Sequence, residues 1–400
     1  MGRPTSKVAR VVVTGPLAPF AAAYKTRLAE LGYTPLSIVN GLRQVAHLSR
    51  WMQLGDISVE HLDREQLEQF LAPRRAAAGS KACSLRGLLV LAEMLDSSGV
   101  VRREGHAPTS PEESLLVSFR RYLLAERGLA EGTADAYVAR AQRFLAGCGS
   151  LATLTSAEVT RAVQCESERV SVGSTQYFVA GVRAFLRFCF IEGLIGADLS
   201  AAALAVTGRR RSSLPRGISQ SDALSLLRAC DRRRSDGRRD YAILAMLVRL
   251  GMRAGEVARL TLDGIDWRTG EIVVHGKGRR VDRLPLPVDV GEALVAYLQR
   301  GRPRTDQREL FLRTVAPIGP LGRGGVSCVV RRACRRAGVP ETGAHRLRHT
   351  VASEMLAAGA DLGEIGQVLR HRARSSTAIY ARVDVNALRE IALPWPGGAR

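Results

Sequence analysis

Apolar residues recur three and four positions apart over much of the first hundred residues, and glycines follow several of these stretches. This spacing places the apolar side chains on one face of a helix, and glycine is common just past a helix end. The pattern therefore predicts a helical module over residues 16–105. Residues 1–15 lack the pattern, which indicates a flexible arm.

The same plan returns over residues 112–205. "ELGYT" and "ERGLA" lie 96 residues apart, and "SSGVV" and "IEGLI" lie 94 residues apart. Similar offsets at both ends of a segment favour a tandem repeat of one helical module. Any two segments of four amphipathic helices also look alike, so an unrelated second bundle stays open as the alternative.

The pattern changes after the polar stretch "TGRRRSSLPRG" at 207–217, whose charge, proline and glycine indicate a linker. Helical spacing resumes at residue 218, but "EIVVHGKGRRVDRLPLP" alternates and predicts two strands joined by a tight turn. The chain is therefore expected to be mainly α with a small β-sheet. The sheet belongs to an α+β domain over 218–384, and a tail follows over 385–400.

Composition narrows the class of protein. Four hundred residues exceed one ordinary core, which agrees with several domains. No stretch approaches the roughly 20 apolar residues that span a bilayer, and no signal peptide is recognisable, so we expect a cytoplasmic protein with no membrane partner. The seven cysteines are scattered without a CxxC pair, which favours reduced thiols over a disulfide framework or a zinc ribbon.

The net charge of +21 points to a polyanionic partner. The excess is uneven, because residues 208–384 contain 34 Lys and Arg against 18 Asp and Glu, a balance of +16. Such a balance in a chain of folded composition favours nucleic acid. A solvated basic surface, or an affinity for ribosomes or membranes, is the less specific alternative.

Lysine is rare in this chain. The lysines are Lys7, Lys25, Lys81 and Lys277, among 59 basic residues. Lys277 falls in the tight turn "GKGR" of the predicted hairpin. A lysine can release a proton at an accessible pKa, whereas an arginine effectively cannot. Lys277 is therefore a candidate general acid, and chance survival of a lysine at a turn is the alternative.

Four more basic groups and one tyrosine lie in the same region as Lys277. Arg253 stands at the entrance to a helix, and His345 and Arg348 are three apart, which places them on one helix face. His371 ends a helical segment, and Tyr380 lies nine residues later. Arginines suit phosphate oxygens, histidines donate hydrogen bonds or move protons, and a tyrosine can form a covalent intermediate. Together these groups indicate phosphoryl transfer without a metal.

The motifs that contain these residues resemble the successive boxes of the tyrosine recombinase (phage-integrase-like) family. They are "LGMRAGEVARL", "GKGRR", "HRLRHTVASEMLAAGAD", "VLRH" and "TAIYARV". The resemblance extends over about 218–384 in order, spacing and residue type. Residues 112–205 are similar, more loosely, to the family's core-binding (SAM-like) DNA-binding domain.

The resemblance implies a role for each residue. Those that contact the scissile phosphate are Arg253, His345, Arg348 and His371. Tyr380 attacks the phosphate and forms a 3′-phosphotyrosyl link, and Lys277 protonates the departing 5′ oxygen. Glu256 matches an acidic position of the family and orients its neighbours, while His349 packs below the active face.

The resemblance also implies the partners. Such an enzyme acts on double-stranded DNA with no metal, ATP or other cofactor. It assembles as a homotetramer on two DNA sites, with or without accessory proteins, in the nucleoid. A type IB topoisomerase or a telomere resolvase would share the chemistry, and a non-catalytic DNA-binding regulator would lack it. The length and the match of the motifs favour a recombinase, integrase or transposase of a mobile element.

Two features depart from the family pattern. The family often has "LGH" where this chain has "LRH", so Arg370 replaces a glycine, and we expect its side chain to reach solvent or DNA. The module over 16–105 has no counterpart in the minimal family plan. It is expected to bind arm-type DNA, to extend the clamp on the duplex, or to contact a partner subunit.

Some of these residues also fit other interpretations. His345 and His349 are four apart, as zinc ligands on a helix can be, but the glutamate of a metalloprotease motif is missing and adjacent arginines would repel a cation. "SEMLAAGADLGEIGQVLRH" also resembles a helix-turn-helix, which alone would favour a regulator. In the tail, Trp395 with Leu388 and Ile391 is expected to dock on a neighbouring subunit or on its own domain.

Overall fold

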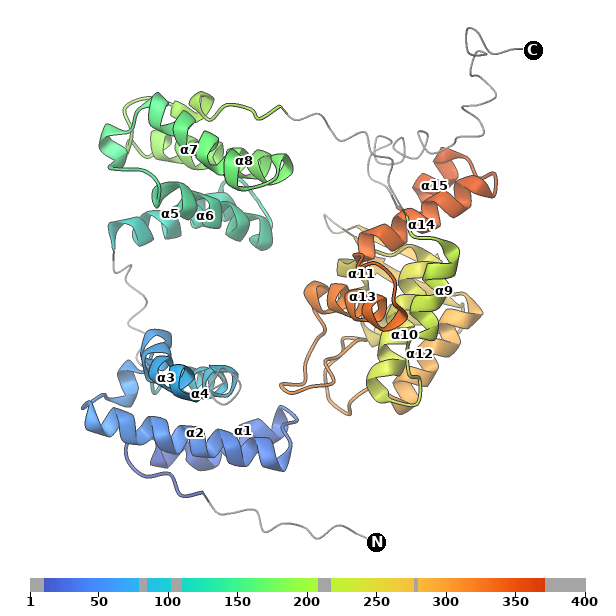
Figure 1. Ribbon diagram of the computed structural model, residues 1–400, viewed down its shortest axis with the longest axis horizontal. Helices are drawn as coiled ribbons and strands as arrows, with labels where there is room; N and C mark the ends of the chain where they lie inside the picture. Colours follow the sequence, from blue (N-terminus) through green and yellow to red (C-terminus); the bar gives the residue numbers. More distant parts are fainter. Residues whose placement is uncertain (1–10, 79–84, 102–109, 208–216, 277–279, 371–400) are drawn as a thin grey trace. The chain divides into compact units, whose positions relative to one another are not determined.

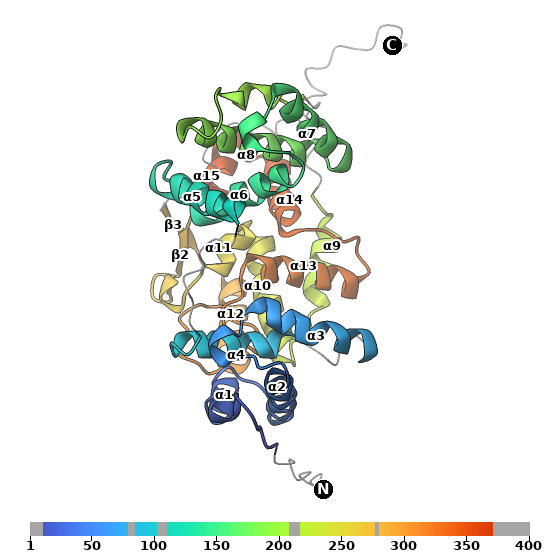
Figure 2. The same cartoon turned by 90° about the vertical axis from the view of Figure 1, so that its left-hand side faces the viewer.

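The computed structural model describes residues 11–78, 85–101, 110–207, 217–276 and 280–370. Residues 102–212 form one compact unit, and residues 1–101 with 213–400 form the other. Figure 1 and Figure 2 show the elements of each unit from two directions. The predicted tail and nearly all of the predicted linker fall outside the described residues. Within the described ranges, no helix is both long and apolar enough to cross a membrane.

The N-terminal region is helical, as the apolar spacing predicts. Its elements are η1 (Ala18–Phe20), α1 (Ala21–Glu30), α2 (Pro35–Leu54), η2 (Val59–His61), α3 (Arg64–Ala78) and α4 (Leu85–Ser97). The hydroxyl of Thr34 caps α2 by accepting a hydrogen bond from the Ser37 N–H, and Pro35 suits the first turn. The apolar faces bury a core that includes Leu48 and Phe70.

Residues 110–207 contain a second set of helices. They are α5 (Pro111–Ala125), α6 (Glu131–Leu145), η3 (Leu151–Thr153), α7 (Ser156–Arg169), α8 (Val172–Ile191) and η4 (Leu199–Ala202). Thr155 and Glu158 cap α7 reciprocally. The rings of Phe119 and Phe144 lie 5.2 and 6.3 Å from Phe185 of α8, which makes the core partly aromatic. The tandem-repeat interpretation stays a prediction, because helix lengths differ between the two sets.

The C-terminal region is built around one central helix. Its helices are α9 (Gln220–Arg228), α10 (Ser235–Leu250), α11 (Ala254–Ala258), η5 (Leu262–Gly264), α12 (Val288–Arg300), α13 (Arg323–Ala337), α14 (Ala344–Ala357) and α15 (Leu362–Val368). Ten of the 16 residues of α10 are buried, and α12, α13 and α14 pack against it (Figure 1). A helix that is buried on most sides forms the core of its domain.

A small antiparallel sheet completes this region. Its strands are β1 (Ile265–Asp266), β2 (Glu271–His275) and β3 (Val281–Pro285), in the order β1-β2-β3. Beyond the last cross-strand partners, His275 and Val281, the Gly276 N–H donates to the Arg280 carbonyl at 2.8 Å. The predicted hairpin and the predicted fold class, mainly α with a small sheet, are confirmed. β1 was not predicted, because two residues are too few to show alternation.

Candidate active site

The junction between α10 and α11 sets the direction of Arg253. Gly251 follows the last residue of α10, and its φ of 57° lies in the left-handed region that glycine adopts without strain. A Cβ at this position would lie 2.6 Å from the Leu369 side chain, so the close packing also requires glycine. Arg253 precedes the first residue of α11 and has an extended conformation. Its side chain is 42% exposed, so the guanidinium can reach a ligand.

Glu256 holds Arg253 by two hydrogen bonds. One oxygen of its buried carboxylate, Oε1, accepts from Arg253 Nη1 at 2.6 Å, and the other, Oε2, accepts from the Arg253 backbone N–H at 2.9 Å. Burial acts to raise the pKa of Glu256, but the backbone hydrogen bond from Arg253 and the positive charges of Arg370 and Arg253 outweigh it and lower the pKa. Glu256 is therefore ionised at neutral pH, and it holds both the backbone N–H and the guanidinium of Arg253.

Arg348 joins three segments of the chain. Its side chain comes from α14, and the whole residue is only 1% exposed. Nη1 donates to the Gly251 carbonyl at 2.7 Å, and Nη2 donates to the Leu369 carbonyl. The guanidinium therefore connects α14 to the end of α10 and to the residue that follows α15. Its predicted contact with a phosphate stays a prediction.

His345 and His349 lie on successive turns of α14, with ring centroids 4.4 Å apart. Burial and the charges of Arg348, Arg253 and Arg323 lower the pKa of His345. Burial, together with the charges of His345 and of arginines on the same helix, lowers the pKa of His349 to about 4. Both imidazoles are therefore neutral at pH 7, each with one N–H to donate.

Five predicted site residues are thus described, and three are not. Arg253 and Glu256 are in direct contact, and Arg253 and Arg348 both influence His345 electrostatically. Lys277, His371 and Tyr380 lie outside the described residues. Among the described residues, no group of three or more His, Cys, Asp or Glu side chains has the arrangement of a metal site.

Arg370 corrects one expectation. We expected its side chain to reach solvent or DNA, but the residue is only 8% exposed, and its Nη2 donates to Glu256 Oε2 at 2.7 Å. The physical reason is that the buried Glu256 carboxylate requires positive charge around it. Nothing in the local sequence indicated this contact, because 114 residues separate the two partners.

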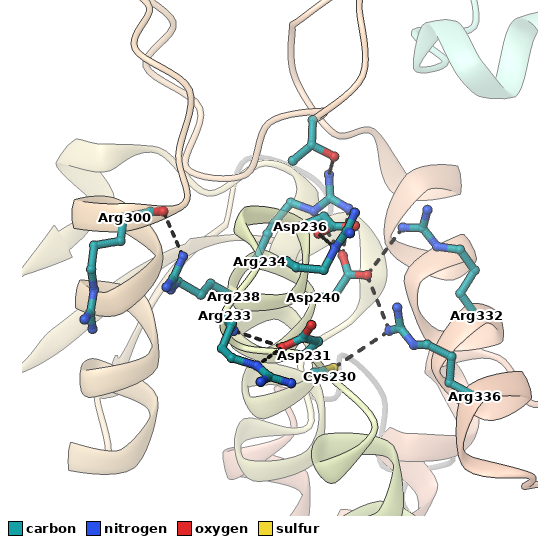
Figure 3. A network of polar contacts seen from close by, with 12 residues as sticks. Cys230, Asp231, Arg233, Arg234, Asp236, Arg238, Asp240, Arg300, Arg332 and Arg336 are labelled. Carbon is teal, nitrogen blue, oxygen red and sulfur yellow. Dashed lines mark hydrogen bonds and ion pairs between the residues drawn. The ribbon is translucent and has the colours of Figure 1, made fainter. Parts of the chain in front are cut away.

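A second buried carboxylate, Asp240 in α10, was also missed. Its Oδ1 accepts two hydrogen bonds from Arg239, at 2.7 and 3.1 Å. Its Oδ2 lies 3.5 Å from Arg332 and 3.6 Å from Arg336, both of α13 (Figure 3). Arg239 also donates to the carbonyl of Leu312 at 3.1 Å. This Asp240 cluster ties α10 to α13 and to the loop before it.

Comparisons with known proteins agree with this architecture. The profile described as "Phage integrase family" matches residues 216–387. A putative integrase/recombinase, y4rA of Sinorhizobium fredii, is 40% identical over 96% of this chain and 96% of the relative. The tyrosine recombinase XerD of Mycobacterium tuberculosis is 32% identical over 70% of this chain and 96% of the relative.

Solved structures show the same fold at low identity. A lambda integrase dimer bound to a COC′ core site has a TM-score of 0.54 at 18% identity, over 78% of this chain and 89% of that one. The Tn1549 transposon integrase in complex with circular intermediate DNA has a TM-score of 0.51 at 15% identity, over 70% of this chain and 99% of that one. At these identities the similarity concerns the fold alone.

Proposed function

This chain belongs to the phage integrase family of tyrosine recombinases, and on that premise we propose that Arg253, His345 and Arg348 bind the scissile phosphate while Tyr380 attacks it. The enzyme is a site-specific recombinase that cuts and rejoins DNA strands, as an integrase of mobile elements does. The observation that carries the residue assignment is the Glu256 carboxylate. It holds the half-exposed Arg253 by two short hydrogen bonds, beside a neutral His345.

The proposed step conserves the energy of the phosphodiester bond. The Tyr380 oxygen attacks phosphorus and passes its proton to solvent, a tyrosyl–phosphorus bond forms, and the bond from phosphorus to the 5′ oxygen breaks. Lys277 donates a proton to that oxygen, so a 5′-hydroxyl leaves. The 5′-hydroxyl of a partner strand then attacks the phosphotyrosine and returns its proton to Lys277, while the released tyrosine takes up a proton from solvent. No ATP is consumed, because the phosphotyrosyl link has about the same energy as the bond that it replaces.

The described residues supply the electrostatic part of this step. Negative charge grows on the non-bridging oxygens during the attack, and fixed guanidiniums stabilise it without reorganising. Glu256 keeps Arg253 in one orientation, and Arg348 fixes the backbone of Gly251 just before it. His345, with its pKa lowered by burial and by the nearby arginines, donates a hydrogen bond as a neutral imidazole at pH 7. His371 is proposed to add a further donor.

The partner of the enzyme is DNA, and the finer assignments are proposals. We assign residues 112–205 to duplex binding, and a homotetramer on two sites, with or without accessory proteins, to strand exchange. We place the action of the enzyme at the nucleoid. A type IB topoisomerase would instead relax supercoiled DNA as a monomer. Supercoil relaxation that stays proportional to protein concentration, with no recombinant product from two paired sites, would favour that alternative.

The chemistry is tested by trapping the covalent intermediate. The protein is incubated in EDTA with nicked duplexes that carry the end sequences of its own mobile element. Loss of the short 5′-hydroxyl strand then prevents religation. A protein–DNA adduct on a denaturing gel, mapped to Tyr380 by mass spectrometry, is the expected result. Tyr380→Phe should form no adduct and still bind the duplex, and an adduct with this variant would contradict the mechanism.

A further inference from the structure

Arg370 occupies a backbone position that suits glycine. Its φ is 53°, and Asp56 is the one other non-glycine residue with positive φ among the described residues. A side chain in the left-handed region is disfavoured, so the arginine must be held by its contacts. Its Nη2 donates to Glu256 at 2.7 Å, and the two side chains are 4% and 3% exposed. This buried ion pair compensates for the unfavourable backbone.

Two contacts connect the same two segments of the chain. Arg348 bridges the carbonyls of Gly251 and Leu369, and Arg370 binds Glu256 a few residues further along. Glu256 in turn holds both the backbone N–H and the guanidinium of Arg253. The orientation of Arg253 therefore depends on a carboxylate whose other cationic partner is Arg370.

We propose that Arg370 is a positioning residue for strand cleavage: it fixes the Glu256 carboxylate in the orientation that directs Arg253 at the scissile phosphate. The inference rests on the proposed role of Arg253. Without Arg370, Glu256 would keep its hydrogen bonds from the backbone and side chain of Arg253 but lose its buried counter-charge, and the carboxylate would be held less firmly. Glycine at residue 370 would adopt this backbone conformation without strain but would remove the ion pair with Glu256. The arginine therefore keeps the carboxylate fixed in spite of an unfavourable backbone conformation.

The test compares Arg370→Gly and Arg370→Lys with the parent in single-turnover cleavage of the nicked duplex. Arg370→Gly should cleave at least about tenfold more slowly with its Kd for DNA within about twofold, and Arg370→Lys should recover part of the rate. The second readout is a duplex with a neutral methylphosphonate at the scissile position. A neutral methylphosphonate needs less stabilisation by the positive charge of Arg253. The loss of cleavage rate in Arg370→Gly should therefore be smaller on this linkage than on the phosphodiester, and the same should hold for Arg253→Ala.

The outcomes separate the two hypotheses. An unchanged rate for Arg370→Gly, or an equal loss on both linkages, would overturn the positioning role. An Arg253→Ala variant that cleaves as fast as the parent would instead overturn the proposed function. If Arg253→Ala is inactive while Arg370→Gly is fully active, only the further inference fails.

A different observation concerns the other end of α10. A hollow of about 740 Å³ lies there, lined by the arginines at positions 228, 232, 233, 238 and 300, with Asp231 as its acidic residue and Ala229, Cys230 and Ala296 between them. Arg238 Nη1 is held by the Arg300 carbonyl at 3.1 Å, and the Arg232 guanidinium lies 4.5 Å from the Tyr241 ring centre (Figure 3 shows Arg238 and Arg300). Neither Arg228 nor Arg300 uses its side chain in an ion pair or hydrogen bond with the described residues.

This arginine hollow is remote from Arg253. The 16 residues of α10 rise by about 1.5 Å each, so about 24 Å of buried helix separate its two ends. A phosphate bound at Arg253 therefore cannot also fill the hollow. The lining offers guanidiniums but no large apolar side chain, and guanidiniums suit phosphate oxygens, whereas protein interfaces depend on apolar or aromatic anchors.

The geometry points to a second DNA-binding site at the arginine hollow, where the phosphate backbone of another duplex segment binds without sequence preference. The protein is first saturated with a duplex that carries the end sequence of its own mobile element, which we call its core-site duplex. Retention of a second, labelled, non-cognate duplex is then measured. Arg228→Gln/Arg300→Gln should lower this retention at least about fivefold and reduce its salt dependence, with core-site binding and cleavage unchanged. The control, Arg268→Gln/Arg304→Gln, removes the same charge elsewhere and should retain the second duplex.

Two results would contradict this site. One is equal retention by the parent, the hollow variant and the control. The other is an equal loss of retention in the hollow variant and in the control, which would indicate a dependence on net charge alone. Neither result depends on strand cleavage, so the proposed catalytic function is tested separately.

Discussion

A buried carboxylate lies near each end of α10, and the two hold their arginines differently. Glu256 binds Arg253, three residues before it, at 2.6 Å, and Arg370, 114 residues after it, at 2.7 Å. Asp240 binds its neighbour Arg239 at 2.7 Å, but its two α13 partners lie 3.5 and 3.6 Å away. The short bonds from Glu256 hold the half-exposed Arg253 in one orientation, which the proposed function directs at the phosphate. Asp240 instead compensates buried charge and anchors helix packing.

The largest effect on stability should come from Asp240→Asn. This variant leaves the guanidinium of Arg239, which is 3% exposed, without its counter-charge inside the protein. Removing one partner of a buried ion pair typically costs about 3–5 kcal/mol of the free energy of unfolding. Urea denaturation should show this loss, while the cleavage rate per folded molecule stays within about threefold of the parent. A stable but inactive Asp240→Asn protein would contradict the assignment of Asp240 to helix packing.

Glu256→Gln should slow cleavage per folded molecule as well as lower stability, because Arg370, whose side chain is 4% exposed, also loses its counter-charge. An amide keeps the shape of the carboxylate but cannot balance two arginines, so Arg253 loses its fixed orientation. A misplacement of about 1 Å can slow catalysis about 100-fold, which corresponds to about 2.7 kcal/mol in the barrier. Single-turnover cleavage measures the rate, and a gel-shift titration should give nearly the parent Kd. If the Kd weakens as much as the rate falls, Glu256 supports DNA binding rather than the reaction.

Part of the difference between these two carboxylates could be predicted from the sequence. Arg253, Glu256 and His345 stand in motifs whose spacing predicts one site, and the structure places Glu256 against Arg253. The apolar run of α10 predicts a buried helix, and ten of its residues are buried. Arg370 was expected at the surface because only its replacement of a glycine was visible. The contacts of Asp240 with α13 were not predictable, because they depend on packing between distant segments rather than on a local pattern.

Acid should lower the free energy of unfolding through His349 of α14. The pKa of His349 falls to about 4 from the ordinary value of 6.5 because of burial and nearby positive charge. Between these values the unfolded chain binds more protons than the folded protein, so stability is complete above pH 6.5 and declines as the pH falls toward 4. His345 and, at lower pH, Glu256 act in the same direction. His349→Gln should flatten the dependence of the unfolding free energy on pH in this window. An unchanged slope would mean that other titratable groups cause the loss of stability in acid.

The smallest effect should come from Arg332→Gln. The Arg332 side chain is 44% exposed and lies 3.5 Å from Asp240, which keeps two hydrogen bonds from Arg239. An ion pair of this kind contributes about 0–1 kcal/mol, because solvent screens it and the long side chain loses entropy when it is held. The Tm should therefore fall by less than about 3 °C. A loss as large as that of Asp240→Asn would mean that Asp240 depends on α13 for its counter-charge. The two carboxylates would then be alike in binding distant segments, and the distinction between orienting an arginine and anchoring a helix would rest on Arg253 alone.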